Sequence, residues 1–252
     1  MTRRTGVVTV MGLSGEEFRG KLMQRIGGEL LCQRMMARLR RAAEADNIEE
    51  GPVGFTACIV EHDQPLLDVA SQLGVDVITC APRSWSTGTV EADMDSDLLH
   101  ELRKRYDCVL CVNPCLPFLT LSSTRAFINR AKAAEGPRLA VFRRGGAVWD
   151  TTGARVIGAE GAPAIHLTGA AHFTSADCFA IYPIEFLEGP LRFRYDFVEV
   201  PRTLEYRIRV TTRSDLELAR AYDAWQSSGG PHAEDGRMTM YLLAKRYAET
   251  GQ

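Results

Sequence analysis

Residues 6–28 read GVVTVMGLSGEEFRGKLMQRIGG, a β-branched run that passes directly into a glycine-rich stretch. Valine dominates Gly6–Met11, which is typical of a buried strand. The glycine-rich part begins at Gly12, immediately after this strand. A strand followed by a glycine-rich turn is typical of the first unit of a parallel α/β sheet, in which ligands bind outside the carboxyl ends of the strands. The stretch therefore predicts such a sheet, with a binding loop at its edge.

Strand and helix patterns alternate over the rest of the chain up to residue 142. The predicted strands are Val53–Val60, Val75–Cys80, Cys108–Val112 and Leu139–Phe142, and the predicted helices are Glu29–Ala45, Pro65–Leu73 with Asp63 as its cap, Ser96–Arg105, and a helix from Ser122 or Ser123 to Glu135. Strands that alternate with helices are joined by right-handed crossovers and form a mostly parallel sheet. We therefore predict an α/β fold in which helices cover both faces of that sheet.

Residues 144–204 have a different pattern. Glycine and proline are frequent, no long helix is evident, and the short β-like pieces are Phe179–Tyr182 and Leu191–Phe197. We interpret this region as a small β-rich arm or dimerisation lobe inserted into one domain that spans residues 1–252. After it we expect a strand over Glu205–Val210, a helix over Ser214–Trp225 and a last amphipathic helix around residues 238–247.

Composition and charge exclude several classes of partner. The chain has 252 residues, of which 45% are hydrophobic and 25% are charged, as in an ordinary globular protein. Lys and Arg number 30 against 32 Asp and Glu, and this net charge of -2 gives no global field for nucleic acid or an anionic membrane. No apolar run approaches the ~20 residues that span a bilayer. The seven cysteines lie mostly in apolar runs, which predicts reduced thiols and a cytoplasmic protein.

The loop after the first strand has the chemistry of a phosphate site. Backbone N–H groups would face phosphate oxygens there, and the residues that offer them are Gly12, Leu13, Ser14, Gly15 and Gly20. Two cations in the same loop, Arg19 and Lys21, would neutralise a triphosphate, the guanidinium through a forked contact and the ammonium as a point charge. The alternative is a surface loop whose glycines and charges are incidental.

Gly15–Lys21 also matches the first part of the P-loop pattern G-x-x-x-x-G-K. Leu22 stands where that pattern has the Ser or Thr that binds magnesium, and Gly27-Gly28 interrupts the long helix that a P-loop opens. A P-loop NTPase is therefore an alternative that predicts an uninterrupted helix immediately after Gly20.

Four stretches occur in an order that matches one known family. They are VVTVMGLSGEEFRGKLMQRIGGELLCQRMMARL at residues 7–39, Val60–Gly74, Tyr106–Thr120 and Arg207–Ala219. Together they resemble the nucleotide-sugar pyrophosphorylases, and among these the cytidylyltransferases that make CMP-activated acidic sugars. The residues that fit the family's R-x-G-S-x-R/K-x-P-G-K loop and G-G-K-P-L turn are Ser14, Arg19, Gly20, Lys21, Gly27, Gly28 and Leu30. The resemblance covers most of residues 6–225.

The resemblance implies a three-layer α/β/α nucleotidyltransferase fold, Rossmann-like, and a homodimer. It implies transfer of CMP from CTP to an acidic sugar of the acylneuraminate or another ulosonate type, with release of pyrophosphate. Arg19 and Lys21 would be the catalytic cations that stabilise the leaving pyrophosphate. Asn113 and Arg83 would orient the base and the ribose.

The resemblance also places the sugar pocket in the inserted region. His172 lies there and would touch the substrate, with a hydrogen-bonded surface histidine as the alternative. Arg192 and Arg194 alternate with aromatic residues on a strand-like piece. They would bind the sugar carboxylate through bidentate pairs, or they decorate an exposed sheet face.

Mg²⁺ is the cofactor that the resemblance implies. The family's magnesium ligands are acidic residues near the end of the fourth strand and in the closing signature, where this chain has Cys115, Arg209 and Thr211. The metal ligands therefore stay unassigned, because Mg²⁺ prefers hard oxygen ligands. A substitute source, or merely a solvated helix start, is the acidic run Glu91, Asp93, Asp95 and Asp97. A non-catalytic nucleotide-binding pseudoenzyme of the same fold is the second alternative.

Overall fold

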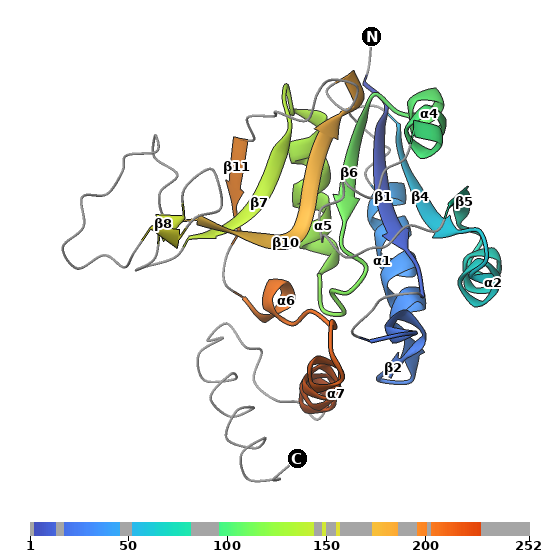
Figure 1. Ribbon diagram of the computed structural model, residues 1–252, viewed down its shortest axis with the longest axis vertical. Coiled ribbons are helices and arrows are strands. Elements are labelled where there is room, and N and C mark those ends of the chain that lie inside the picture. The colour runs from blue at the N-terminus through green and yellow to red at the C-terminus, as the bar shows by residue number, and fades with distance from the viewer. Residues whose placement is uncertain are drawn as a thin grey trace.

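A seven-stranded sheet forms the centre of the protein (Figure 1). The computed structural model describes residues 3–13, 18–45, 52–81, 96–143, 148–149, 155–156, 173–185, 196–200 and 203–227. The strands of the sheet are β1 (Thr5–Met11), β4 (Val53–Val60), β5 (Asp76–Cys80), β6 (Cys108–Val112), β7 (Arg138–Arg143), β10 (Phe173–Pro183) and β11 (Asp196–Glu199). Their order across the sheet is β11-β7-β10-β6-β1-β4-β5.

The sheet is mostly parallel, as predicted. β5, β4, β1 and β6 are parallel neighbours, and β7 and β11 are parallel to each other. β10 runs antiparallel to both β6 and β7, between which it lies. All five residues of β6 are buried, as expected for a strand that is covered on both faces. The predicted α/β fold class is therefore confirmed.

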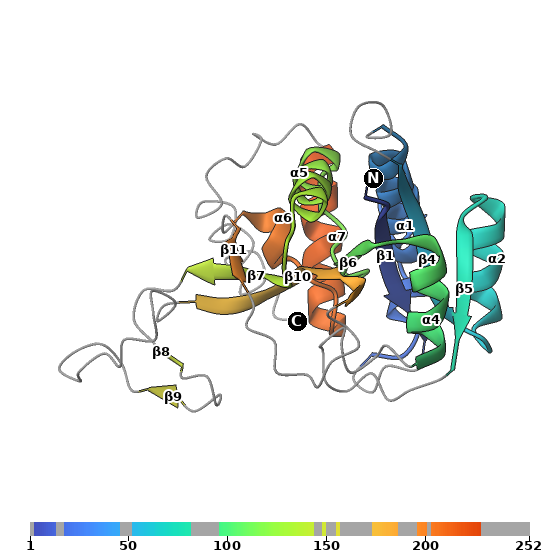
Figure 2. The ribbon, with the colours of Figure 1, turned by 90° about the horizontal axis from the view of Figure 1, so that it is seen from above.

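Helices cover both faces of the sheet (Figure 2). They are α1 (Leu31–Ala45), α2 (Gln64–Gln72), α4 (Ser96–Arg105), α5 (Leu121–Lys132) and α7 (Arg213–Ser227). One apolar core joins α1, α2, α5 and α7 to strand residues such as Val7, and a second core joins α4 to strand residues such as Val8. Because successive strand residues point to opposite faces, Val7 faces one helix layer and Val8 faces the other.

The prediction of a strand over Glu205–Val210 is wrong. A four-residue helix, α6 (Leu204–Arg207), and a short extended stretch take its place. Tyr206, Ile208 and Val210 are nevertheless buried. The alternation in the sequence therefore reflects burial against the core, not pairing in a sheet.

The start of α5 also differs from the prediction. Thr120, not Ser122 or Ser123, is the N-cap, and its hydroxyl accepts a hydrogen bond from the Ser123 N–H at 3.1 Å. The helix ends at Lys132, three residues before the predicted end at Glu135.

The region predicted as an arm, residues 144–204, contributes to two sheets. β10 and β11 belong to the main sheet. β8 (Val148–Trp149) and β9 (Arg155–Val156) pair as a small hairpin beyond the ends of β7 and β10, away from the helices (Figures 1 and 2). The predicted helix around residues 238–247 lies outside the described residues.

The seven cysteines are free and buried, and they serve as apolar side chains of the core. Within the described parts of the chain, no helix is both long and apolar enough to cross a membrane.

Candidate functional site

Three segments that are distant in sequence meet at the carboxyl edge of the sheet. They are the loop after β1, the segment that follows β6, and residues 208–212 before α7. The Val210 N–H donates to the Cys115 carbonyl at 2.9 Å, and Lys21 of the loop hydrogen-bonds the Cys115 thiol. Figure 1 shows α6, α7 and the loop strand β2 (Arg25–Ile26) gathered below the ends of β1 and β6. This is the edge at which the sequence predicts a ligand.

The loop after β1 closes on itself and then turns back as a hairpin. Gly20 has a φ of 68°, and its N–H donates to the Leu13 carbonyl at 3.2 Å. A three-residue 3₁₀ turn, η1 (Lys21–Met23), and the hairpin of β2 (Arg25–Ile26) and β3 (Glu29–Leu30) follow. A long helix is therefore absent directly after Gly20, so the structure argues against the P-loop alternative.

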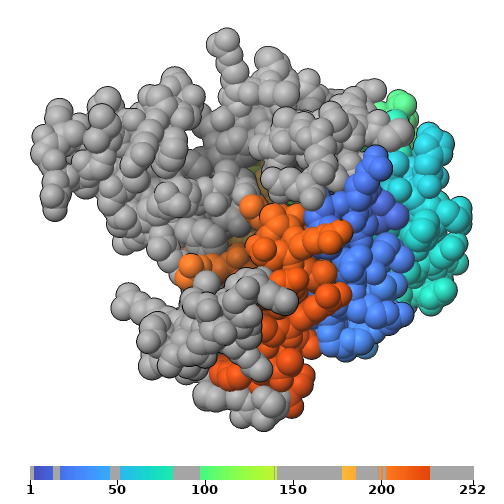
Figure 3. All heavy atoms as spheres, turned by 60° about the horizontal axis from the view of Figure 1, so that its bottom comes forward, coloured from blue at the N-terminus to red at the C-terminus, as the bar shows by residue number. Residues whose placement is uncertain are grey.

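The hairpin turn requires its two glycines. Gly27 and Gly28 have φ values of 58° and 87°, which favour glycine in a two-residue turn. A Cβ on Gly27 would collide with the Asp223 carboxylate, which pairs with Arg34 at 2.7 Å. Both charged side chains are mostly buried, at 11% and 15% exposure. Figure 3 shows the C-terminal segment that includes α7 packed against this N-terminal segment.

Asp63 holds the start of the loop. It occupies the N-cap position of α2, as predicted, but its side chain makes no capping hydrogen bond there. The carboxylate accepts the Leu13 N–H instead, at 2.8 Å. The Leu13 N–H, which we predicted to face phosphate, thus points to Asp63. The sequence signal for this role is an acidic residue just past the end of β4, where the sequence predicts a helix cap.

The segment after β6 is shaped by Asn113. Its side-chain Oδ1 accepts the Cys115 N–H at 2.8 Å, an Asx turn that mimics a backbone turn. Its own N–H donates to the Cys178 carbonyl of β10 at 3.0 Å. These two bonds hold Asn113 directly after the carboxyl end of β6.

Two side chains that the sequence did not indicate fix the rest of that segment. Arg38 of α1 donates to the carbonyls of Pro117 and Leu119 at 2.9 and 2.6 Å. Glu205 of α6 accepts the Thr120 N–H at 3.2 Å. Burial lowers the pKa of Arg38, with the nearby Arg34 charge acting in the same direction. These hydrogen bonds tie the segment after β6 to α1 and α6.

Cys115 is at the centre of the site and is a neutral group. It is 5% exposed, and burial raises the pKa of its thiol although the Lys21 and Arg209 charges act in the opposite direction. Both cations are half-buried. The site therefore carries two positive charges around a protonated thiol.

Thr211 is engaged at the start of α7. Its hydroxyl donates to Asp215 Oδ2 at 2.6 Å, and the same oxygen accepts the N–H groups of Thr211 and Thr212 at 3.0 and 2.8 Å. The Thr212 hydroxyl in turn accepts the Asp215 N–H, which completes a capping box. Burial works to raise the pKa of Asp215, but these hydrogen bonds outweigh it and leave the pKa lowered.

Magnesium does not fit the three positions at which the resemblance implies its ligands. Cys115 offers a protonated sulfur, and the Arg209 guanidinium has no lone pair to give to a metal. The Thr211 hydroxyl is a neutral oxygen that donates its hydrogen bond to Asp215. Within the described residues, no three His, Cys, Asp or Glu side chains form a group that could hold a metal ion. Of the predicted acidic run, Asp97 lies in the first turn of α4 and the rest falls outside the described residues.

The remaining predicted residues separate into two sets. Gly12 is half-buried after β1, and Arg19 is exposed and has no side-chain partner among the described residues. Six others lie outside the described residues: Ser14, Gly15, Arg83, His172, Arg192 and Arg194.

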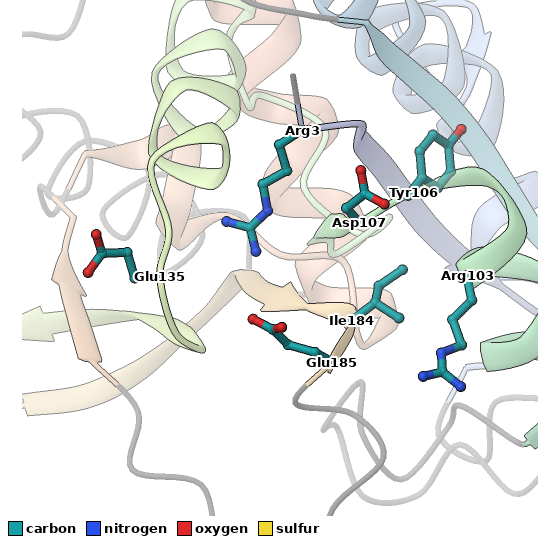
Figure 4. A pocket seen from close by; sticks show the side chains of 7 residues that line it. All are labelled: Arg3, Arg103, Tyr106, Asp107, Glu135, Ile184 and Glu185. Carbon is teal, nitrogen blue, oxygen red and sulfur yellow. The ribbon is translucent and has the colours of Figure 1, made fainter. Parts of the chain in front are cut away.

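A cavity of about 600 Å³ lies at the opposite, amino edge of the sheet (Figure 4). Its lining residues are Arg3, Arg103, Tyr106, Asp107, Glu135, Ile184 and Glu185. Arg3 and Asp107 precede β1 and β6, and Ile184 follows the antiparallel β10. Ligands of parallel sheets bind at the carboxyl edge, so this cavity is separate from the predicted site.

The fold is similar to those of solved cytidylyltransferase structures. A CMP:2-keto-3-deoxy-manno-octonic acid synthetase complexed with CTP has a TM-score of 0.58 at 13% identity, over 88% of this chain and 99% of that chain. A 4-diphosphocytidyl-2C-methyl-D-erythritol synthase from Anaerococcus prevotii has 0.59 at 13%, over 88% and 98%. A cytidylyltransferase from Leptospira borgpetersenii has 0.57 at 11%, over 98% and 96%.

The sequence alone gives no such match. No family model matches it, and no curated protein is detectably similar to it. At 11–13% identity, the structural likeness establishes the architecture. The protein has the α/β nucleotidyltransferase-like fold of these cytidylyltransferases.

Proposed function

We propose that this protein is a cytidylyltransferase that transfers CMP from CTP to an acidic sugar and releases pyrophosphate. The observation that carries the proposal is the convergence of Lys21, Cys115 and Arg209 at the carboxyl edge. Two cations at the ligand-binding edge of a nucleotidyltransferase-like sheet favour a polyphosphate as the ligand. The similar solved structures include a synthetase complexed with CTP.

The reaction is a substitution at phosphorus. The sugar hydroxyl oxygen forms a bond to the α-phosphorus while the bond from that phosphorus to the bridging oxygen of the β-phosphate breaks. The electron pair leaves with pyrophosphate, and the hydroxyl proton passes to solvent. Such transfers depend mainly on positioning and charge neutralisation. Lys21 and the exposed Arg19 would neutralise the pyrophosphate as its charge develops.

Five of the predicted residues would share the recognition of the two substrates. Asn113 and Arg83 would orient the base and ribose, and His172, Arg192 and Arg194 would bind the sugar, with the two arginines on its carboxylate. We further propose that residues 144–204 contribute to a homodimer. The sugar class comes from the four sequence stretches that resemble the acylneuraminate and 3-deoxy-octulosonate enzymes.

The test is pyrophosphate release by the full chain with each of the four ribonucleoside triphosphates and a panel of acidic sugars. We expect release with CTP and at least one ulosonate, and little with the other nucleotides. CTP binding without turnover on any sugar would instead favour the pseudoenzyme. Absence of both binding and turnover would contradict the proposed nucleotide site.

A further inference from the structure

The structure brings together the positions at which the resemblance implies magnesium ligands. The segment after β6 and the segment before α7 are joined by the hydrogen bond from Val210 to Cys115. Lys21 reaches the same thiol from the loop after β1. The site is therefore assembled, but its side chains differ in charge from those of a carboxylate metal site.

These side chains repel a divalent cation and attract an anion. The Lys21 and Arg209 charges both act on Cys115, whose buried thiol carries no compensating charge. Asp215, at the start of α7, uses Oδ2 for three hydrogen bonds. Guanidinium and ammonium groups are themselves strong partners of phosphate oxygens.

We infer that Lys21 and Arg209 take the charge-neutralising role at this site, so that the protein binds a nucleoside triphosphate as the metal-free anion. This inference rests on the proposed function and specifies the form of nucleotide that the site accepts. Arg209 thereby becomes a binding residue in its own right. It is half-buried, which strengthens its attraction for an anion relative to an exposed arginine.

The first test is calorimetric titration of the full chain with CTP, once in excess EDTA and once in excess Mg²⁺. The inference predicts that the dissociation constant for CTP in EDTA is at most about threefold higher than in Mg²⁺. A larger weakening would overturn the inference, and pyrophosphate release in Mg²⁺ would then still support the proposed function. If CTP binds in neither buffer, both fail.

Variants sharpen this result. Arg209→Gln removes the charge at similar length, and we expect about tenfold weaker CTP binding in EDTA. Arg103→Gln, at the amino edge, is the matched control and should bind as the wild type does. Unchanged binding by Arg209→Gln would overturn the inference, provided that thermal unfolding shows both variants to be folded.

A substitution that adds a carboxylate to the site should make CTP binding depend on Mg²⁺. Cys115→Asp places a carboxylate beside Lys21 and Arg209, with Cys115→Ser as the neutral control. We expect Cys115→Asp to bind CTP about tenfold more weakly in EDTA and to recover affinity in Mg²⁺, because a carboxylate is a hard ligand. Cys115→Ser should show no such dependence on metal, and a dependence in both variants would contradict the inference.

Discussion

The two edges of the sheet differ in how their charges are used. At the amino edge Arg4 pairs with Asp107 at 2.9 Å, and each of these side chains is 44% exposed. At the carboxyl edge Lys21 is half-buried, bonds a neutral thiol, and has no carboxylate partner among the described residues. A cation held near the interior without an opposite charge favours an anionic ligand, whereas the two charges of an exposed ion pair already neutralise each other. The cavity described above lies at the amino edge, whereas the Lys21 charge indicates an anionic ligand at the carboxyl edge.

The largest effect that distinguishes the edges is expected at Lys21. Lys21→Ala should lower kcat/KM for CTP about 100-fold, since a preorganised charge at the leaving group is lost. Lys21→Arg should recover part of this activity because it keeps the charge. Lys104→Ala on α4, an exposed lysine at the amino edge, is the control in the same pyrophosphate assay. Equal activities of Lys21→Ala and Lys104→Ala would contradict the functional difference between the carboxyl and amino edges.

The hairpin supplies the next effect, on stability. Gly28→Ala should cost about 1 kcal/mol because it forces an alanine to a positive φ where nothing lies within 4 Å. Gly27→Ala should cost about 2 kcal/mol more, since the added Cβ displaces the carboxylate that Arg34 holds. Urea unfolding of the pair measures the difference. Identical unfolding midpoints would mean that α7 does not fix the hairpin.

Asp63 tests whether the loop after β1 is held in place for the nucleotide. Asp63→Ala leaves the Leu13 N–H without its acceptor, and we expect KM for CTP to rise about tenfold. Asp63→Asn retains an acceptor oxygen and should have a smaller effect. Steady-state kinetics give the KM values. A lower kcat of Asp63→Ala with an unchanged KM would assign Asp63 a different role.

The smallest effect is a pH dependence at the start of α7. The pKa of Asp215 is lowered in the folded state, so its contribution is complete above the unfolded value of about 4 and is lost as pH falls through the lower folded value. Asp215→Asn should therefore cost about 1 kcal/mol at pH 7 and progressively less below pH 4. Urea unfolding of both proteins from pH 7 to 3 measures this. A gap that does not change with pH would exclude the carboxylate charge as its cause.

The sequence predicted the architecture well where local signals and packing agree. Cys108–Val112 and Ser96–Arg105 were predicted to the residue, because a fully apolar run and a helix with a basic last turn are strong local patterns. Glu205–Val210 was mispredicted because alternating burial arises in any extended segment that lies on a core. β10 was seen only as a short piece, since its register in the sheet depends on pairing with two strands, β6 and β7, that are distant in sequence.

The candidate site was only partly predictable. The loop cations and Asn113 are visible as residues near the ends of predicted strands. The roles of Asp63, Arg38 and Glu205 depend on backbone groups that are distant in sequence, from 50 to 85 residues away. Such side chain–to–backbone bonds leave no periodic signal. The neutral state of Cys115 likewise follows from burial, which spacing does not reveal.

Amide hydrogen exchange with and without CTP tests the central claim most directly, because it reports on both edges of the sheet in one experiment. We predict slower exchange on CTP binding in the peptides that cover residues 12–24, 113–120 and 207–215, with no change around Arg103–Asp107 and Ile184. Protection confined to the amino-edge cavity, or no protection in the three carboxyl-edge segments, would contradict the account.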